Sequence, residues 1–137
     1  MICTFIGHRD ASYAIIARLK DVIIDLIENK NVNKFYIGNH GNFDYMVKEV
    51  LKELKDIYNI SYYIVLAYIP QKDEFTEYKD TIYLDELNKV PPRFRIVMRN
   101  RIMIDKSDFV VTFAKGIGKT RDFKEYAKKQ NKIIIEL

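Results

Sequence analysis

Short apolar runs alternate along this chain with segments in which apolar residues recur at every third or fourth position. The runs have the length and composition of buried strands, and they cover 2–6, 34–37, 60–69, 108–113 and 133–135. The periodic segments have the pattern of amphipathic helices, and they cover 11–29, 42–57, 92–106 and 119–130. Near-continuous apolar strands that alternate with such helices form parallel sheets covered on both faces. The sequence therefore predicts an α/β fold, a Rossmann-like three-layer sandwich with a mainly parallel five-stranded sheet and helices on both faces.

One segment, 71–92, interrupts this alternation. It is polar and acidic, and its strand-like stretch is Thr81-Ile82-Tyr83-Leu84. A long connection of this kind is often a lid or a binding loop. A chain of 137 residues has the length of one ordinary domain, so we expect a single Rossmann-like domain over 1–137 with a lid-like insertion near 71–90. Tyr68, just before this segment, is a candidate to stack on a base, and packing at the sheet edge is the alternative.

Composition narrows the classes of function. The formal net charge of +4 suits an anionic ligand, but it does not by itself indicate nucleic acid. No apolar run approaches the roughly 20 residues that a membrane-spanning helix needs, and residues 1–6 lack the pattern of a signal peptide. A cytoplasmic protein without membrane contact is therefore expected. The single cysteine, Cys3, lies in a strand pattern and is predicted to be a core residue.

A polar cluster, Gly7-His8-Arg9-Asp10, follows the first apolar run. In an open α/β sheet, ligands bind outside the carboxyl ends of the strands, where helix N-termini face the same crevice. Gly7 allows the backbone to approach a ligand closely. Arg9 suits phosphate or carboxylate, and His8 can donate, accept or relay a proton. We predict that Gly7, His8 and Arg9 bind ligand; the alternative is a plain turn with Asp10 as the helix cap.

A second polar cluster, Gly38-Asn39-His40-Gly41-Asn42, follows the second run. Its two glycines leave backbone N–H groups free at the start of the next helix, and such nests hold anions. Asp44, in the first turn of that helix, either favours the helix dipole or accepts a hydrogen bond from a ribose or a base. All six residues are candidate ligand-binding residues. A metal site of His8, His40 and Asp44 has no diagnostic spacing, so no metal is predicted and no cofactor is identified.

The helix predicted over 92–106 contains an arginine on its apolar side. At about 100° per residue, the inward stripe consists of Phe94, Val97, Met98, Ile102 and Ile104. Arg101 lies in the middle of this stripe, and Arg99 lies on its flank. A buried guanidinium needs acceptors or a bound anion, so both arginines are predicted to reach the crevice. The alternative for Arg101 is an internal ion pair with Asp105 or Asp108, or a side chain that extends to solvent.

A glycine-rich turn, Lys115-Gly116-Ile117-Gly118-Lys119-Thr120, follows the run at 108–113. It is not a Walker A loop, because Phe113 stands where that loop requires a glycine. A glycine-rich turn into a helix can still bind phosphate through its backbone N–H groups. Gly116, Gly118 and Thr120 are therefore predicted to bind ligand, and a plain strand-to-helix turn is the alternative.

Taken together, these motifs resemble those of the SLOG superfamily, which joins the DNA-processing protein DprA/Smf with the Lonely Guy enzymes. The chain resembles most closely the short YpsA-like members. The resemblance covers nearly the whole chain and rests on 3–9, 35–44, Arg99-Asn100-Arg101 and the late glycine turn. It implies a Rossmann-like fold, a crevice for nucleotides or nucleotide-derived ligands, and a homodimer.

The resemblance also implies candidate catalytic residues. Lonely Guy enzymes cleave the N-glycosidic bond of a nucleoside monophosphate, using an arginine on the helix before the fourth strand and a glutamate after a Pro-Gly-Gly-x-Gly-Thr turn. Arg99 or Arg101 matches that arginine. The turn of this chain lacks the proline, and Phe123 stands where the acid is expected. Glu125 is the nearest glutamate, two residues later and on another face of its helix.

The favoured hypothesis is the binding of a nucleotide or nucleotide-derived small molecule for sensing or signalling. Phosphate would lie on the turns at 38–42 and 116–120 and on Arg9 or Arg101. The lid-like segment would cover the ligand.

Two alternatives remain from other classes of function. One is an N-glycosidic hydrolase or transferase acting on nucleotides, with a carboxylate supplied by Asp44, Glu125 or an acid of the lid-like segment. The other is single-stranded nucleic-acid binding, by analogy with DprA. Its surface would consist of basic residues near the C-terminus: Lys115, Lys119, Arg121, Lys124, Lys128, Lys129 and Lys132.

Overall fold

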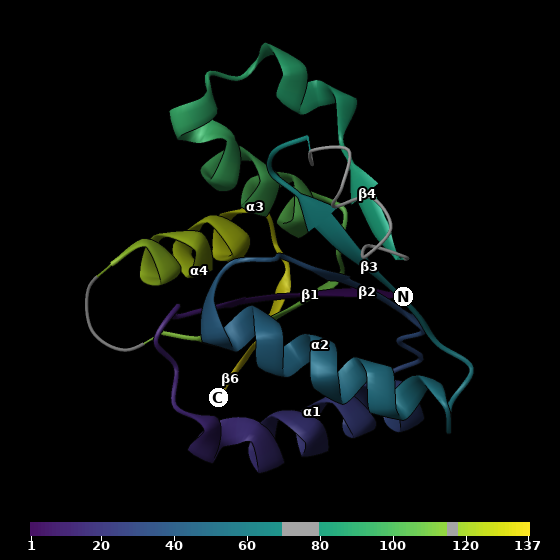
Figure 1. Cartoon of the computed structure of the whole chain (residues 1–137). Helices are drawn as coiled ribbons and strands as arrows, with labels where there is room; N and C mark the ends of the chain where they lie inside the picture. The colour runs from purple at the N-terminus through teal and green to yellow at the C-terminus, as the bar shows by residue number, and fades with distance from the viewer. Residues whose placement is uncertain (70–79, 115–117) are drawn as a thin grey trace.

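One parallel sheet runs through the middle of the molecule (Figure 1). The computed structural model describes residues 1–69, 80–114 and 118–137, and six strands form within them. They are β1 (Ile2–Gly7), β2 (Lys34–Ile37), β3 (Ser61–Leu66), β4 (Thr81–Tyr83), β5 (Phe109–Phe113) and β6 (Ile133–Glu136). Their order is β4-β3-β2-β1-β5-β6, and every neighbouring pair is parallel. The predicted α/β fold is confirmed, with one strand more than expected, because the stretch at 81–84 supplies β4 at the sheet edge.

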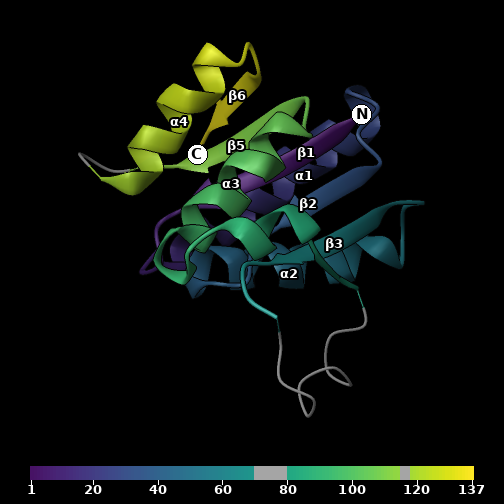
Figure 2. The same ribbon diagram turned by 90° about the horizontal axis from the view of Figure 1, so that it is seen from above.

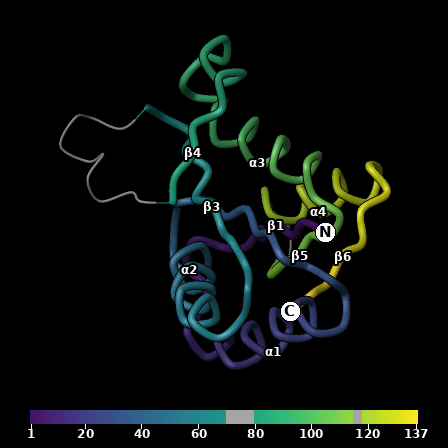
Figure 3. Tube along the Cα trace, turned by 90° about the vertical axis from the view of Figure 1, so that its right-hand side faces the viewer, coloured from purple at the N-terminus to yellow at the C-terminus, as the bar shows by residue number. Residues whose placement is uncertain are grey.

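Helices cover both faces of the sheet, as predicted (Figures 1 and 3). Helices α1 (Ile16–Asn29) and α2 (Gly41–Lys55) pack on one face, and α3 (Arg95–Asp105) and α4 (Lys119–Lys129) pack on the other. Short 3-10 helices are η1 (Tyr13–Ile15), η3 (Asp85–Lys89) and η4 (Pro92–Phe94). No helix in the described parts of the chain is long and apolar enough to span a bilayer.

The predicted lid-like insertion at 71–90 falls only partly on described residues. Residues 70–79 lie outside them. The rest of the insertion forms β4, which continues the sheet beside β3, and η3. This described part is therefore tied to the sheet.

The central strands β1 and β5 are near-continuously apolar because both of their sides are buried. In β5, Val111 and Phe113 contact the core beneath α1 and α2, whereas Val110 contacts the core beneath α3 and α4. Cys3 in β1 is fully buried, which confirms its predicted place in the core. Each large apolar side chain that is buried in this way stabilises the fold by roughly 1.5–3 kcal/mol.

The order of the strands reverses beside β1. The chain adds β2, β3 and β4 on one side of β1 and then returns to add β5 and β6 on the other. A crevice forms at the carboxyl ends of the strands where such a reversal occurs. Gly7 at the end of β1 is paired with Phe113 at the end of β5, so both strands end at the same level. Figure 2 shows α3 and α4 side by side over this part of the sheet.

Candidate ligand-binding site

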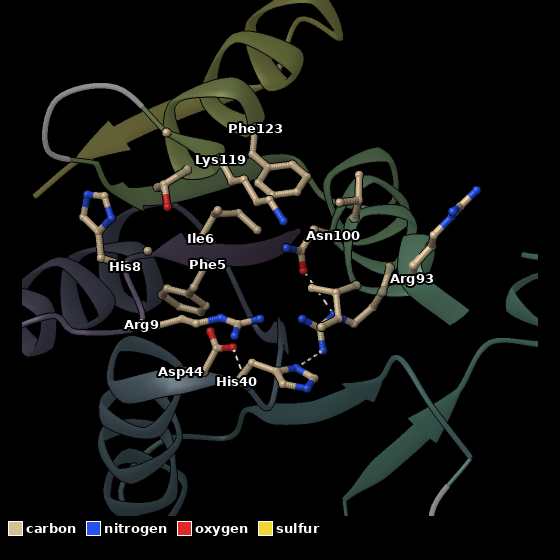
Figure 4. Close-up of a pocket in the computed structure, with 16 residues that line it drawn as sticks. Phe5, Ile6, His8, Arg9, His40, Asp44, Arg93, Asn100, Lys119 and Phe123 are labelled. Atoms are coloured by element: carbon tan, nitrogen blue, oxygen red, sulfur yellow. Dashed lines mark hydrogen bonds between the residues drawn. The ribbon is translucent and has the colours of Figure 1, made fainter. Parts of the chain in front are cut away.

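A cavity of about 310 Å³ opens at this crevice (Figure 4). Four parts of the chain line it: the end of β1 with the loop after it, the start of α2, helix α3 with the turn before it, and the start of α4. Ile6, Val97 and Phe123 contribute apolar walls. The volume lies at the lower end of the range for small-molecule sites, and the position is one where open α/β sheets bind ligands.

The lining of the cavity is positively charged. Arg9, Arg93, Arg99 and Lys119 contribute cations, and Asp44 is the one carboxylate among the described lining residues. Charges interact more strongly in a partly enclosed site than in bulk water. This lining therefore favours an anionic ligand.

Arg99 is the most deeply buried of these cations, with 2% of its surface exposed. Its Nη1 donates to Asn39 Oδ1 at 2.8 Å and to His40 Nδ1 at 3.2 Å. Nη1 also donates to the Val65 carbonyl at 3.3 Å, and Nε donates to Asn100 Oδ1 at 3.1 Å. Burial lowers the pKa of Arg99, but these neutral acceptors meet the requirement of a buried guanidinium for hydrogen bonds.

The ring of His40 is fixed as a neutral tautomer. Because a guanidinium can only donate, His40 Nδ1 is the acceptor in its contact with Arg99, and the proton lies on Nε2. Burial, followed by the charges of Arg99 and Arg9, lowers the pKa of His40 to about 4. At neutral pH the ring therefore offers a ligand an N–H donor and carries no charge.

Asp44 caps the start of α2 with its carboxylate. Its Oδ2 accepts a hydrogen bond from the backbone N–H of His40 at 3.0 Å. Burial raises the pKa of Asp44 to about 6, although this hydrogen bond and the charges of Arg99 and Arg9 act in the opposite direction. A Cβ at Gly38 would lie 2.6 Å from Asp44 Oδ2 and 3.0 Å from Arg99 Nη2, so the absence of a side chain at Gly38 lets these groups approach.

The loops after β1 and β2 are joined through their backbones. The N–H of Asn42 donates to the Arg9 carbonyl at 2.7 Å. Gly41 has φ +89°, and a Cβ there would lie 2.5 Å from Arg9 Cα, so only glycine fits this contact without strain. The Arg9 side chain extends toward Asp44 and His40 (Figure 4). The structure thus brings the two predicted polar clusters together.

The start of α4 forms the other end of the cavity. Gly118, Lys119 and Thr120 line it; Thr120 is buried, and Lys119 is exposed. No carboxylate of the described residues lines the cavity at this end. Gly116, the remaining candidate from the late turn, lies outside the described residues.

The expectation that Arg101 occupies the inward stripe of its helix is wrong. Arg101 is exposed, and its guanidinium lies 5.4 Å from the ring centroid of Tyr126. Ile104 is buried as predicted, but the other buried residues of α3 are Arg99 and Met103, and Phe94, which was also predicted inward, is exposed. The helix turns this side inward because the acceptors that hold Arg99 lie beneath it.

Glu125 does not lie at the cavity. It is exposed on α4 and forms an ion pair with Lys128 at 3.6 Å. Phe123, at the position where the resemblance led us to expect an acid, lines the cavity with its ring. Of the carboxylates proposed for hydrolysis, Asp44 is the one that the described structure places in the site.

Several other candidates lie beside the cavity and do not line it. Tyr68 packs edge-on against the His40 ring, with centroids 6.4 Å apart, and its hydroxyl donates to the Pro92 carbonyl at 2.9 Å. Asn42 is exposed in the first turn of α2. Gly38, Asn39 and Gly41 line a second cavity of about 250 Å³, whose wall also includes Asp44.

Three polar residues that line the cavity were not predicted to do so from the sequence. Arg93 precedes α3 and Asn100 lies within it, whereas Lys119 begins α4. Lys119 was named only for the basic nucleic-acid surface and not as a residue of the crevice. Asn100 was part of the Arg99-Asn100-Arg101 motif but was given no role, since its contact with Arg99 Nε appears only in the structure.

Comparison with known proteins adds a structural relationship. No family model matches the sequence, and no curated protein matches it significantly. The structure is similar to that of DNA processing protein A from Helicobacter pylori, which has been studied for its single-stranded DNA binding mode, with a TM-score of 0.63 and 15% sequence identity. The chain therefore shares the α/β fold of that protein. The similarity covers 99% of this chain and 64% of that chain.

At this level of identity, the likeness to DNA processing protein A establishes the fold alone. It agrees with the resemblance to the SLOG superfamily found in the sequence. The cavity at the carboxyl ends of β1 and β5 therefore has to be interpreted from its own residues.

Proposed function

We propose that this protein binds a nucleotide or a nucleotide-derived small molecule in the cavity at the ends of β1 and β5. The observation that carries the proposal is the charge of the lining, where four cationic side chains face one carboxylate among the described residues. Binding without turnover suits sensing or signalling.

The two ends of the cavity suit different parts of such a ligand. The start of α4 offers backbone N–H groups and Lys119 to a phosphate. Ile6, Val97 and Phe123 offer apolar surface to a base or a sugar face. Arg101, which was expected to bind phosphate, is exposed on α3 and has no part in the proposed site.

A thermal-shift screen with nucleoside mono-, di- and triphosphates tests the proposal. A ligand at a hundred times its Kd stabilises the folded state by about 2.7 kcal/mol, which raises Tm. The variant Arg9→Gln should weaken the shift, whereas Arg18→Gln, an exposed arginine on α1, should leave it unchanged. Melting temperatures of the wild type that stay flat across the panel would contradict the proposal.

Hydrolysis of an N-glycosidic bond is a second candidate function, supported by Asp44. Burial raises the pKa of this carboxyl to about 6 within the cavity, and groups with such values suit general acid–base catalysis. Water would add at the sugar carbon as the bond to the base breaks, and the base would leave with a proton. Incubation with nucleoside monophosphates should release free base, and Asp44→Asn should abolish this release; no release by the wild type removes the candidate.

Single-stranded DNA binding is supported only by the structural likeness to DNA processing protein A. The basic surface predicted for it is partly neutralised, because Lys124 pairs with Glu136 and Lys128 pairs with Glu125. An oligonucleotide mobility shift that weakens steeply with salt would support this function.

Membership of the YpsA-like group and a homodimeric state also remain proposals. Analytical ultracentrifugation tests the homodimeric state.

A further inference from the structure

The α2 end of the cavity combines charged side chains from three elements. Arg9 follows β1, Asp44 belongs to α2, and Arg99 belongs to α3. When Asp44 is ionised, the two guanidinium groups still leave this end with a net positive charge. The ion pairs between described residues include none of the three side chains. The charge of the two arginines is therefore not cancelled by a direct contact with Asp44.

Both guanidinium groups have donors for a ligand. Arg99 is 2% exposed, and its hydrogen bonds within the described chain run from Nε and Nη1. Its Nη2 lies beside Gly38, where a Cβ would be 3.0 Å away from it. The Arg9 guanidinium points toward Asp44 and His40 in the same part of the cavity (Figure 4). Guanidinium groups from two elements, with donors that no carboxylate contacts, suit an oxyanion.

The Asp44 carboxylate is the obstacle to such an anion, and it is also the group that can remove the obstacle. An oxyanion bound by both arginines lies close to a like charge, which favours the protonated form of the carboxyl. Asp44 Oδ2 accepts from the His40 N–H at 3.0 Å, so a proton on Oδ1 keeps that bond and donates to the anion. Burial already raises the pKa of Asp44 to about 6, and a neighbouring anion raises it further.

We infer that the α2 end of the cavity is a proton-linked anion subsite: a phosphate or carboxylate group of the ligand binds between Arg9 and Arg99, and Asp44 takes up a proton as it binds. This inference rests on the proposed function, because it concerns the same cavity, and it adds regulation by pH. The anion binds more tightly as the pH falls, since less work is then needed to protonate Asp44.

The other titratable and charged groups around Asp44 do not account for this proton. Burial and the charges of the two arginines lower the pKa of His40 to about 4, so its ring is neutral in the range concerned. The His8 ring points away from Asp44 (Figure 4). Lys48, one turn further along α2, borders the second cavity together with Asp44. Asp44 is the one carboxyl group among the described residues that line the first cavity.

An NMR titration with sulfate at constant ionic strength tests the inference, because sulfate is a tetrahedral oxyanion that does not titrate near neutral pH. The backbone amide signals of Gly38 and His40 report on the α2 end, and that of Lys119 reports on the α4 end. At the α2 end, the wild type should bind sulfate about tenfold more tightly at pH 6 than at pH 8. Asp44→Asn, whose amide resembles the protonated carboxyl, should bind at both pH values as the wild type does at pH 6.

Asp10→Asn is the matched control, because Asp10 is an exposed acid of the neighbouring loop that does not line the cavity. It should keep the pH dependence of the wild type. A second measurement needs no variant at Asp44: calorimetry with sulfate at pH 7, in two buffers of different ionisation enthalpy, counts the protons bound. The wild type should take up roughly half a proton or more for each sulfate bound.

Equal affinity of the wild type for sulfate at both pH values, or a pH dependence that persists in Asp44→Asn, overturns the inference. No sulfate binding at the α2 end at pH 6 overturns it as well. These results leave the proposed function standing, because the thermal-shift screen tests nucleotide binding separately. Flat melting temperatures in that screen contradict the proposed function, whereas pH-linked sulfate binding at the α2 end would still support the subsite.

Discussion

The two ends of the cavity begin alike in sequence and end differently in structure. Each is a glycine-containing turn that leads from a strand into a helix, after β2 at one end and after β5 at the other. At the α2 end, Asp44 and the buried Arg99 fill the space around the turn with internal hydrogen bonds. At the α4 end, the exposed Lys119 lines the cavity, and no carboxylate of the described residues lines that end.

This difference shows that a glycine turn before a helix does not define a phosphate site by itself. From the sequence, phosphate was expected on both turns. A helix N-terminus attracts an anion, but a side chain of the same helix can supply that anion. In this protein Asp44 occupies the α2 turn, whereas at the α4 turn Lys119 lines the cavity and no carboxylate of the described residues does.

Replacement of Arg99, at the α2 end of the cavity, should have the largest effect on the free energy of unfolding. Arg99→Met leaves the acceptors on Asn39, His40 and Val65 unpaired and removes a cation near Asp44. We expect a loss of about 3 kcal/mol in the free energy of unfolding, measured by urea denaturation. The control is Arg101→Met on the exposed side of the same helix, with an expected change within about 0.5 kcal/mol. Equal effects of the two variants would contradict the burial pattern of α3.

Neutralisation of the Asp44 carboxylate at the α2 end should stabilise the protein at neutral pH. Burial raises the pKa of Asp44 from 3.8 to about 6, so between these values the folded state binds more protons than the unfolded state. The contribution of Asp44 to stability therefore falls as pH rises through this window. Asp44→Asn should gain about 2 kcal/mol at pH 7.5 and progressively less toward pH 4.

Thermal or urea unfolding at several pH values measures this gain. Asp10→Asn, at an exposed acid, should show no comparable pH-dependent gain. A variant Asp44→Asn that is less stable than the wild type at pH 7.5 would show that the carboxylate stabilises the turn more than its burial destabilises it.

Titration of His40 by NMR tests the hydrogen bonding at the α2 end in the wild-type protein. The pKa of His40 is lowered from 6.5 to about 4, so between these values the unfolded state binds more protons and the contribution of His40 to stability rises with pH. The ring should stay neutral, with the proton on Nε2, down to about pH 4. His8→Gln removes the other histidine and assigns the signals. A His40 that titrates near 6.5 would contradict the hydrogen bond from Arg99.

Replacement of Lys119 should have the smallest effect on stability. Lys119→Gln changes an exposed side chain, so the free energy of unfolding should stay within about 0.5 kcal/mol of the wild type. Nucleotide affinity, measured by calorimetry, should fall about tenfold, because a charged hydrogen bond to phosphate is lost. Lys129→Gln, exposed at the other end of α4, is the control. Unchanged affinity in Lys119→Gln would argue against phosphate at the α4 end.

The sequence by itself determined the α/β fold and located the loops that line the cavity. Burial on both faces makes the central strands apolar throughout, and helices keep a 3.6-residue period, so both signals are local and can be read along the chain. These signals located β1, β2, β3, β5 and β6 and the turns after β1, β2 and β5. They identified the stretch of β4 but left its place in the sheet open, because that depends on pairing with β3.

Only the tertiary structure decided which arginine enters the core and what surrounds it. The helical period placed Arg101 inward, since it counts apolar neighbours within one helix. Arg99 is buried instead, because the fold places its acceptors Asn39, His40 and Val65 beside it. They lie 60, 59 and 34 residues away in sequence, so no pattern within the helix reveals them. The role of Asp44 was left open for the same reason: its charge is balanced by groups from other elements. A buried charge is placed by partners that only the folded chain brings together.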